Sequence, residues 1–209
     1  MNNSVVEIEI LEVSGWPGAI RGMRNPKDSW ERADTVFYPE IKIGPNDMEL
    51  AKTLVVGGPE HRKFARMIHV QMDLVLPRYI WSEFDTYHHN TKNSCSTMHK
   101  LLTPRPIGLG DFIYDEKDKP VLEEIIKELN TLRLQYINKE TPASEKKTIL
   151  RRAKQILPEG FLQRRTVDTN YEELRTIYFQ RRTHRLPEWQ WFCDEIKKLP
   201  YFEELFLTD

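Results

Sequence analysis

Polar groups that could bind a ligand or do chemistry are concentrated between residues 86 and 99. This segment has almost no apolar residue, and ordering so polar a segment is costly unless it binds something. Its polar members are Thr86, Tyr87, His88, His89, Asn90, Asn93, Ser94, Cys95, Ser96, Thr97 and His99. We therefore expect a site at this segment.

Three kinds of chemistry are compatible with these residues. A metal site would combine one of the adjacent imidazoles, His88 or His89, with the Cys95 thiol and a further histidine, His99. This spacing matches no standard zinc pattern. Cys95 would be a nucleophile if an imidazole lay beside it, but a lone cysteine between two serines is more often structural. Hydroxyls and amides that hold a phosphate or a heterocycle without reacting fit the composition best.

A second set of candidate residues follows Asp168, where one helix face is predicted to carry Asn170, Leu174, Ile177, Arg181 and His184. Asn170 and Arg181 would lie about 16 Å apart along the helix axis, which suits an extended ligand such as a nucleotide or dinucleotide. The planar, permanently charged guanidinium of Arg181 suits a phosphate or a pair of carbonyls. A salt bridge from Arg181 to a nearby glutamate is the alternative.

Composition bounds the class of protein. The 209 residues predict a single domain, with a helical lobe at about residues 118–157. The 31 basic and 32 acidic residues, net charge −1, argue against a nucleic-acid binder. The chain shows no apolar run of membrane-spanning length, no signal peptide and, with two cysteines, no disulfide framework. We expect a cytoplasmic protein without a membrane or nucleic-acid partner.

The periodicity of apolar residues predicts an α+β fold, with a small antiparallel sheet flanked by helices. Apolar and polar residues alternate in 6–10 and 68–76, as in strands with one polar face. Helical patterns cover residues 15–24, 48–56, 77–84, 122–136 and 149–157, and two more helices begin near Asn170 and at Pro187. Asn46 or Asp47 is expected to cap the second helix, and residues 103–119 are the expected surface loop.

Residues 77–101 resemble, without a gap, a segment of the flavin-dependent thymidylate synthases (ThyX-like, or thymidylate synthase complementing, proteins). That segment carries an R-H-R-x7-S-x-R motif after an aromatic helix that begins with proline. The resemblance places the triplet on Thr86, Tyr87 and His88, the motif serine on Ser96, and the closing arginine on Met98. It places the motif glutamate on Ser94 and an upstream glutamine on Glu83.

Two further segments carry the resemblance. GGPEHRKF places His61 on a histidine that lies against flavin and nucleotide. LPEGFLQRRTVDTNYEELRTIYFQRRTHRLPEWQWF places Asn170 on a flavin-contacting asparagine and Arg181 on an arginine that binds the pyrimidine nucleotide. The similarity covers most of the chain, more loosely at the N-terminus and across 102–145. The sequence EFDTY…NSCSTMHKL also resembles a divergent branch of uncharacterised proteins from phages and prophages of Gram-positive bacteria.

The resemblance implies the family's fold, a homotetramer with sites at subunit interfaces, and FAD as the candidate cofactor. It implies a ligand site without a protein nucleophile, formed by His61, Glu83, Thr86, Tyr87, His88, Asn93, Ser94, Ser96, Thr97, His99, Asn170 and Arg181. The aromatic residues Trp81, Phe84, Trp189, Trp191 and Phe192 are expected to anchor subunit interfaces.

The departures from the motif decide the expected function. Thr86 and Met98 replace arginines, and each lost charge-assisted hydrogen bond is worth about 1.5–3 kcal/mol. The candidate replacements are His88, His99, Lys92, Lys100 and Arg105. We expect a protein that binds a pyrimidine nucleotide without thymidylate synthase activity. The alternative is a flavin-dependent enzyme that transfers a methyl or hydroxymethyl group to a pyrimidine nucleotide.

Overall fold

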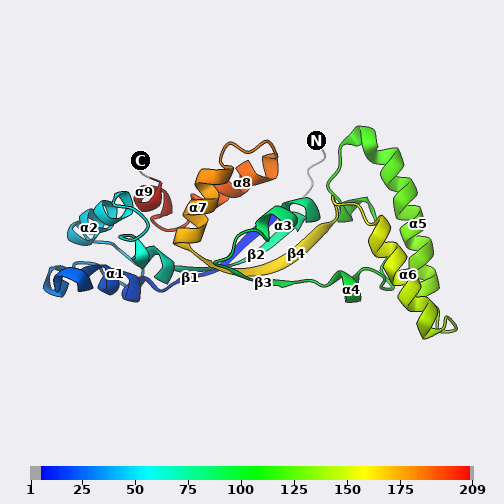
Figure 1. Cartoon of the computed structure of the whole chain (residues 1–209), viewed down its shortest axis with the longest axis horizontal. Helices are drawn as coiled ribbons and strands as arrows, with labels where there is room; N and C mark the ends of the chain where they lie inside the picture. The colour runs from blue at the N-terminus through cyan, green and yellow to red at the C-terminus, as the bar shows by residue number, and fades with distance from the viewer. Residues whose placement is uncertain (1–5, 208–209) are drawn as a thin grey trace. The chain divides into compact units, whose positions relative to one another are not determined.

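A computed structural model describes residues 6–207 of the chain. It contains a four-stranded antiparallel sheet with the strand order β1-β2-β4-β3, together with helices (Figure 1). The strands are β1 (Glu7–Ser14), β2 (His69–Pro77), β3 (Thr91–Ser94) and β4 (Leu162–Asn170). The predicted α+β class is confirmed.

The helices lie between the strands and after the last strand along the chain. The α-helices are α1 (Trp16–Arg24), α2 (Pro45–Val56), α3 (Arg78–Phe84), α4 (Thr97–Lys100), α5 (Lys119–Ile137), α6 (Ala143–Ile156), α7 (Tyr171–Arg181), α8 (Pro187–Ile196) and α9 (Phe202–Phe206). Short 3-10 helices are η1 (Asn25–Lys27), η2 (Trp30–Arg32), η3 (Lys63–Met67), η4 (Leu109–Asp111) and η5 (Glu116–Asp118). None of the helices within residues 6–207 is long and apolar enough to cross a membrane.

The chain divides into two compact units. Unit 1 comprises the chain up to Glu7, Leu74–Thr86 and Asn93–Arg165; unit 2 comprises Ile8–Asp73, Tyr87–Lys92 and Thr166–Asp209. Each strand of the sheet therefore contributes residues to both units. The helix pair α5 and α6 belongs to unit 1, whereas α1, α2, α7, α8 and α9 belong to unit 2.

Strand β2 carries the predicted alternation. Val70, Met72, Leu74 and Leu76 are at most 1% exposed, whereas the intervening His69 and Gln71 are exposed. Helix α3 begins directly after Pro77, as predicted.

Strand β1 also forms as predicted, but its apolar side chains are only partly covered: Ile8 is partly buried, whereas Ile10 and Leu11 are exposed. Ile10 is 41% and Leu11 is 49% exposed. The predicted half-buried face is therefore present at Val6 and Ile8 and fails at Ile10.

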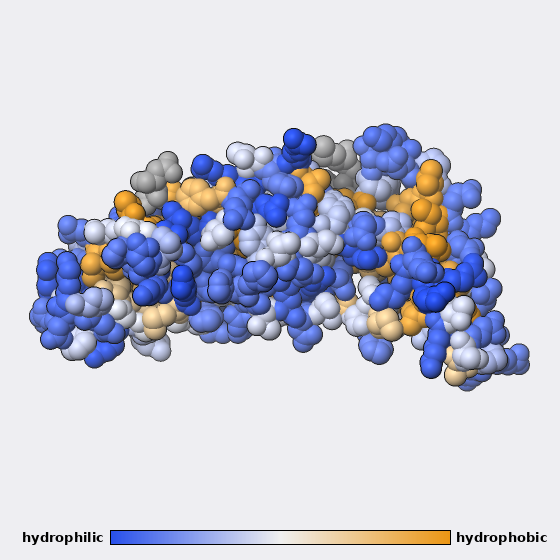
Figure 2. Space-filling view, viewed as in Figure 1, coloured by the Kyte–Doolittle hydropathy of each residue, from blue (hydrophilic) through white to orange (hydrophobic). Residues whose placement is uncertain are grey.

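Unit 1 has its own apolar core, built on the side-by-side helices α5 and α6 (Figure 1). Its helical members are Leu122, Leu129 and Leu132 of α5 and Ile149 and Ala153 of α6. Both predicted helical stripes are thus core. The same helix pair also has hydrophobic residues at its surface (Figure 2), and Val121 and Leu134 of α5 are 64% and 58% exposed.

Unit 2 is built around the ring of Tyr171, which is 0% exposed. Trp16, Phe202 and Phe206 meet this ring edge-on at centroid distances of 5.5, 5.2 and 5.3 Å. The Tyr171 hydroxyl donates to Pro200 O at 2.9 Å, so the buried polar group is satisfied.

Several predictions at the level of single elements are wrong. Strands β3 and β4 and helix α9 were not expected, and β4 occupies the residues before Asn170. Helix α7 ends at Arg181, so His184 lies beyond the helix face to which it was assigned. The expected surface loop 103–119 contains the buried Ile107 and Phe112.

The cap of helix α2 also differs from the prediction. Gly44 is the N-cap residue, and the carboxylate of Asp34 accepts from Asn46 N at 2.9 Å and from Asp47 N at 3.0 Å. Asp47 itself is buried and accepts a 2.6 Å hydrogen bond from Arg24 Nε. The side chain that was expected to cap this helix is used in a buried ion pair instead.

The aromatic residues proposed as interface anchors are mostly core residues. Trp81, Phe84, Trp189 and Phe192 are at most 1% exposed within the chain itself. Their abundance therefore gives no support to an oligomer, because the chain buries them without a partner.

Candidate functional site

Unit 1 contains a solvent-accessible pocket of about 790 Å³ beside the segment that the sequence singles out. Ser96 and Thr97 line it, together with the neighbouring Cys95. The other polar or charged lining residues are Glu7, Lys100, Thr103, Arg105, Asp111, Gln163 and Arg164. A pocket of this volume falls within the range that small-molecule ligands occupy.

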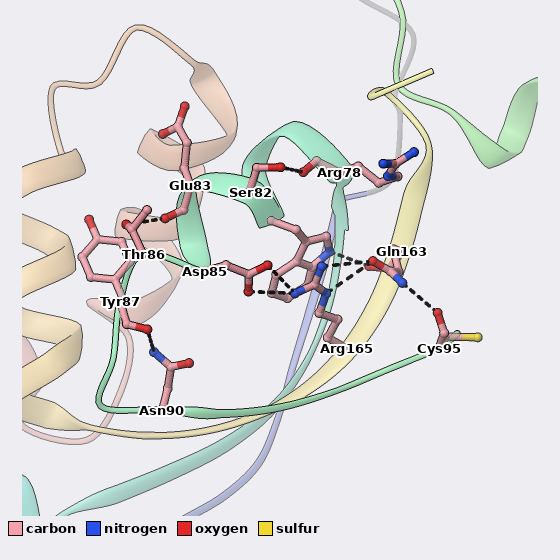
Figure 3. Close-up of polar contacts among 11 residues, drawn as sticks. Arg78, Ser82, Glu83, Asp85, Thr86, Tyr87, Asn90, Cys95, Gln163 and Arg165 are labelled. Carbon is pink, nitrogen blue, oxygen red and sulfur yellow. Dashed lines mark hydrogen bonds and ion pairs between the residues drawn. The ribbon is translucent and has the colours of Figure 1, made fainter. Parts of the chain in front are cut away.

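Strand β4 fixes the backbone of Cys95 at the wall of the pocket. Cys95 N donates to Arg164 O at 2.9 Å, and Gln163 Nε2 donates to Cys95 O at 2.8 Å. Figure 3 shows the Gln163 side chain reaching from β4 to this carbonyl. The two bonds hold the start of the Ser96–Thr97 segment by both its donor and its acceptor.

The side chain of Gln163 is itself held by Arg165 (Figure 3). Arg165 Nη2 donates to Gln163 Oε1 at 3.2 Å, and Nη1 lies 2.9 and 3.1 Å from the two carboxylate oxygens of Asp85. The Arg165 guanidinium also lies 4.4 Å from the ring centroid of Trp81. Helix α3 is thereby connected through Arg165 and Gln163 to the wall of the pocket.

Ser96 has a structural role and keeps a donor. It is the N-cap residue of α4, and its Oγ accepts from Met98 N at 3.2 Å. A serine hydroxyl that accepts one hydrogen bond still has its own hydrogen to donate. The Ser96 hydroxyl can therefore cap the helix and donate to a ligand in the pocket at the same time.

Three cationic side chains and two carboxylates line the pocket. Arg105 forms a two-pronged contact with Asp111, at 2.7 Å from Nη2 to Oδ1 and 3.3 Å from Nη1 to Oδ2. This hydrogen-bonded pair raises the pKa of Arg105. Arg164 Nη2 lies 3.0 Å from Glu7 Oε2, whereas Lys100 makes no ion pair with any residue in 6–207.

The other site residues predicted in unit 1 lie elsewhere. Within the described chain, the pocket lining does not include Glu83, Thr86, Asn93, Ser94 or His99. Thr86 Oγ1 donates to Glu83 O at 2.7 Å (Figure 3). Met98, at the position of the closing arginine, is 49% exposed, and its Sδ accepts from Lys154 Nζ at 3.3 Å.

In unit 2, Tyr87 and Arg181 are brought together. Tyr87 is 8% exposed; its Oη accepts from Arg181 Nε at 2.8 Å and donates to Gln180 Oε1 at 2.9 Å. The Arg181 guanidinium lies 4.8 Å from the ring centroid of Trp189. Burial raises the pKa of Tyr87, against the opposing effect of Arg181.

Asn170, His61 and His88 complete the predicted residues of unit 2. Asn170 Oδ1 accepts from Glu173 N at 3.0 Å, which makes Asn170 the N-cap of α7. The side chain of His61 is 56% exposed, and its Nε2 lies 3.7 Å from Glu60 Oε1. His88 is exposed.

These contacts fit FAD poorly. Of the three positions that the resemblance assigns to the family's triplet, Thr86 gives its proton to a backbone carbonyl and Tyr87 is buried and hydrogen-bonded. His88 is a weak substitute for a guanidinium against a pyrophosphate, because an imidazole has at most two N–H donors where a guanidinium has five. Asn170 can offer a ligand its amide N–H groups, because the helix cap uses only its oxygen.

The alternatives for the polar segment can also be compared with the structure. Among residues 6–207, no cluster of three or more His, Cys, Asp or Glu side chains is arranged to hold a metal ion. The Cys95 thiol is exposed. The segment in fact contributes its backbone to strand β3 and helix α4, so it is not a loop throughout.

Five polar or charged lining residues were missed by the sequence analysis: Glu7, Thr103, Asp111, Gln163 and Arg164. Gln163 and Arg164 belong to β4, the strand that was not predicted. The pairing of β4 with the segment at Cys95 is what brings them to the pocket. The adjacent arginines Arg164 and Arg165 are the sequence signal that could have pointed to this strand.

Comparison with known proteins identifies the fold. No protein-family model and no curated protein sequence matches the chain. A crystal structure of thymidylate synthase X from Helicobacter pylori with FAD and dUMP matches 98% of this chain and 98% of its own, with a TM-score of 0.73 and 18% identity. Another structure of that flavin-dependent enzyme, also with FAD and dUMP, matches 97% of this chain and 98% of its own, with a TM-score of 0.72 and 18% identity. The chain therefore has the fold of the flavin-dependent thymidylate synthases.

Proposed function

We propose that this chain binds a pyrimidine nucleotide and has no thymidylate synthase activity. The observation that carries the proposal is the unit 1 pocket, where Ser96 and Thr97 lie with Lys100 and Arg105. Hydroxyl donors beside an ammonium and a guanidinium suit a phosphate group. The shared fold with structures that contain dUMP supports a pyrimidine nucleotide as the ligand.

The charges of the pocket favour a phosphate at Lys100. Arg105 and Arg164 each have a carboxylate beside them, Asp111 and Glu7, whereas Lys100 has none within the described residues. A phosphate at Lys100 would be stabilised by a positive charge that no neighbouring carboxylate compensates. The N–H groups of Arg105 that do not contact Asp111 would remain as additional donors.

Loss of the original activity is proposed from the motif positions. The family's reaction needs a bound phosphate, an oriented flavin and a polarised pyrimidine together. Met98 supplies a thioether where the resemblance expects an arginine, and Thr86 supplies a hydroxyl that is bonded to Glu83 O. Loss of one preorganised donor commonly costs about 10²–10³ in rate, so several losses leave little activity.

The alternative is an enzyme that modifies a pyrimidine nucleotide with the help of FAD. His61, Ser96, Asn170 and Arg181 are retained at the positions that the resemblance assigns. The matched structures contain FAD as well as dUMP.

We also propose that the protein works as a cytoplasmic homotetramer and is encoded by a phage or prophage.

Calorimetric titration of the full chain with dUMP tests the proposal, with deoxyuridine as the ligand that lacks the phosphate. Lys100→Ala should weaken dUMP binding by about 1.5–3 kcal/mol, the scale of a hydrogen bond to a charged group. It should leave any binding of deoxyuridine unchanged. Lys139→Ala is the matched control, because Lys139 is an exposed lysine of unit 1 outside the pocket. Absence of dUMP binding by the unsubstituted chain would reject the proposed function.

A further inference from the structure

Unit 2 contains a separate cavity of about 440 Å³ between helix α1 and the 3-10 helix η3. It is lined by Gly18, Arg21, Gly22, Asn25, Lys63, Phe64 and Met67. We refer to it as the α1–η3 groove. None of its residues belongs to the nucleotide pocket of unit 1, and its role does not depend on the proposed function.

The shape of the groove follows from the spacing of two glycines. Residues 18, 21, 22 and 25 are three or four positions apart and so share one helix face. A Cβ atom at Gly18 would lie 3.2 Å from Met67 Cε, and one at Gly22 would lie 3.3 Å from Met67 Sδ. The missing side chains leave room that Met67 partly fills, and Met67 and the buried Phe64 form the apolar part of the lining.

The groove is positively charged. Arg21 and Lys63 line it, no carboxylate does, and neither cation forms an ion pair with a residue in the described range. Two other cations of unit 2 are paired, by comparison: Arg62 Nε lies 2.7 Å from Glu172 Oε2, and Lys52 Nζ lies 3.1 Å from Glu204 Oε1. The charge of Arg21 and Lys63 is therefore available to a partner.

An exposed tryptophan extends this surface. Trp30 is 42% exposed, its Nε1 donates to Asn25 Oδ1 at 2.8 Å, and Arg21 lies 4.7 Å from its ring centroid. Met67, which also lines the groove, is 44% exposed. Tryptophan, methionine and arginine are the residue types enriched at protein interfaces, and tryptophan and arginine supply most energetic hot spots.

We propose that the α1–η3 groove binds an acidic segment of a partner protein. An aliphatic or aromatic side chain of that segment would lie on Phe64 and Met67, and its carboxylates would meet Arg21 and Lys63. Charge complementarity selects this partner, because the groove offers two unpaired cations around an apolar floor. A nucleic acid is disfavoured because the chain has no basic excess, with a net charge of −1.

Selection from a random peptide-display library on the immobilised full chain tests the inference. Peptides that combine Asp or Glu with an apolar residue should be enriched. Their affinity, measured by fluorescence anisotropy, should fall about tenfold or more on charge reversal by Arg21→Glu or Lys63→Glu. Gly22→Leu fills the hollow without changing charge, and it should also weaken binding. Lys139→Glu makes the same charge reversal at an exposed position outside the groove and should have no effect.

Several results would overturn the inference. These are enrichment of basic or uncharged peptides, enrichment of no peptide, and selected peptides that bind the Arg21→Glu and Gly22→Leu chains as well as the unsubstituted one. Two further results would assign the groove to another occupant. One is self-association that Arg21→Glu abolishes, and the other is binding of single-stranded DNA that Arg21→Glu abolishes while acidic peptides do not bind. Titration with dUMP, performed on the same variants, reports separately on the pocket of unit 1.

Discussion

The guanidinium of Arg181 donates a 2.8 Å hydrogen bond from Nε to the phenolic oxygen of Tyr87. The same phenol donates to Gln180, and Arg181 packs over the ring of Trp189. Tyr87 stands where the family resemblance places a motif histidine, yet it is 8% exposed. The Tyr87 hydroxyl therefore connects Arg181 and Gln180 in unit 2.

The substitution Tyr87→Phe should destabilise the protein. It removes the hydrogen-bond partner of the partly buried Arg181 Nε, and a hydrogen bond to a charged group is worth about 1.5–3 kcal/mol. The free energy of unfolding in urea measures this loss. Tyr178→Phe is the control. The Tyr178 hydroxyl makes no hydrogen bond within the described chain, and Tyr178 belongs to α7, the helix that also carries Arg181. Equal losses in the two variants would disprove the role assigned to the Tyr87 hydroxyl.

The buried ion pair of Arg24 and Asp47 should dominate the stability of unit 2 at neutral pH. Asp47 also accepts from Thr35 N at 2.9 Å and Thr35 Oγ1 at 2.6 Å. Asp47→Ala leaves Arg24 buried without its partner and should cost about 3–5 kcal/mol. Glu49→Ala, at an exposed position of the same helix, should cost far less. If Asp47→Ala lowered the free energy of unfolding by no more than Glu49→Ala does, the ion pair would not have the stabilising role assigned to it.

The same carboxyl gives an acid dependence with a defined sign. Burial alone would raise the pKa of Asp47, but the hydrogen bonds from Thr35, Arg24 and Asp34 N outweigh it and lower the pKa below its usual 3.8. The stabilisation is complete above the pKa of the unfolded chain and is lost as pH falls through the lower native pKa. The unfolding free energy should therefore fall less steeply with acid in Asp47→Ala than in the unsubstituted chain.

Alkaline pH should destabilise the protein through a buried thiol. Burial and the nearby Asp194 raise the pKa of Cys193 from 9.0 to about 12. Above pH 9.0 the unfolded chain loses this proton while the native chain keeps it, so stability falls as pH rises toward about 12. Cys193→Ala should flatten that decline in urea unfolding measured across this range. Cys95→Ala, which removes an exposed thiol, should leave the slope as it was.

Most of the fold was predictable because the spacing of apolar side chains follows the strands and helices that bury them. Strand β2 alternates buried and exposed residues along its length, and the stripes of α5 and α6 are the core of unit 1. Strand β3 is made of Thr, Lys, Asn and Ser, and β4 has only Val167 and Thr169 buried. These two strands are held by backbone hydrogen bonds. Their side chains show almost no alternation of apolar and polar residues from which a strand could be predicted.

The candidate site was predictable only where it is local in sequence. Ser96, Thr97, Lys100 and Arg105 lie within one short segment, and all four line the pocket. Gln163 reaches the pocket only because β4 pairs with the segment at Cys95, a contact between distant parts of the chain. The Asn170 side chain was assigned to a ligand because of its helix face, but it is the helix cap, a role that Asn often takes.

Flavin should be bound weakly or not at all. The Thr86 hydroxyl already donates to a backbone carbonyl and Tyr87 is buried, so few donors remain at the triplet positions for a pyrophosphate. The purified chain should show no flavin absorption band, and FAD added to it should stay unbound in equilibrium dialysis. Stoichiometric FAD in the purified protein would contradict this prediction and would favour the enzyme alternative.

Expression of this chain should not rescue a bacterium that lacks every thymidylate synthase on medium without thymidine. Met98 presents a thioether bonded to Lys154, and Ser94 lies on strand β3 outside the lining of the pocket. The positions that would hold the phosphate and the flavin thus no longer provide charged donors, and preorganised donors are what this kind of catalysis depends on. Restoring both arginines with Thr86→Arg and Met98→Arg is the informative companion strain. Colonies that depend on the unsubstituted chain would show that Lys100, Arg105 and Lys154 have rebuilt the lost site. Growth of the double variant alone would show that these two side chains are what the scaffold lacks.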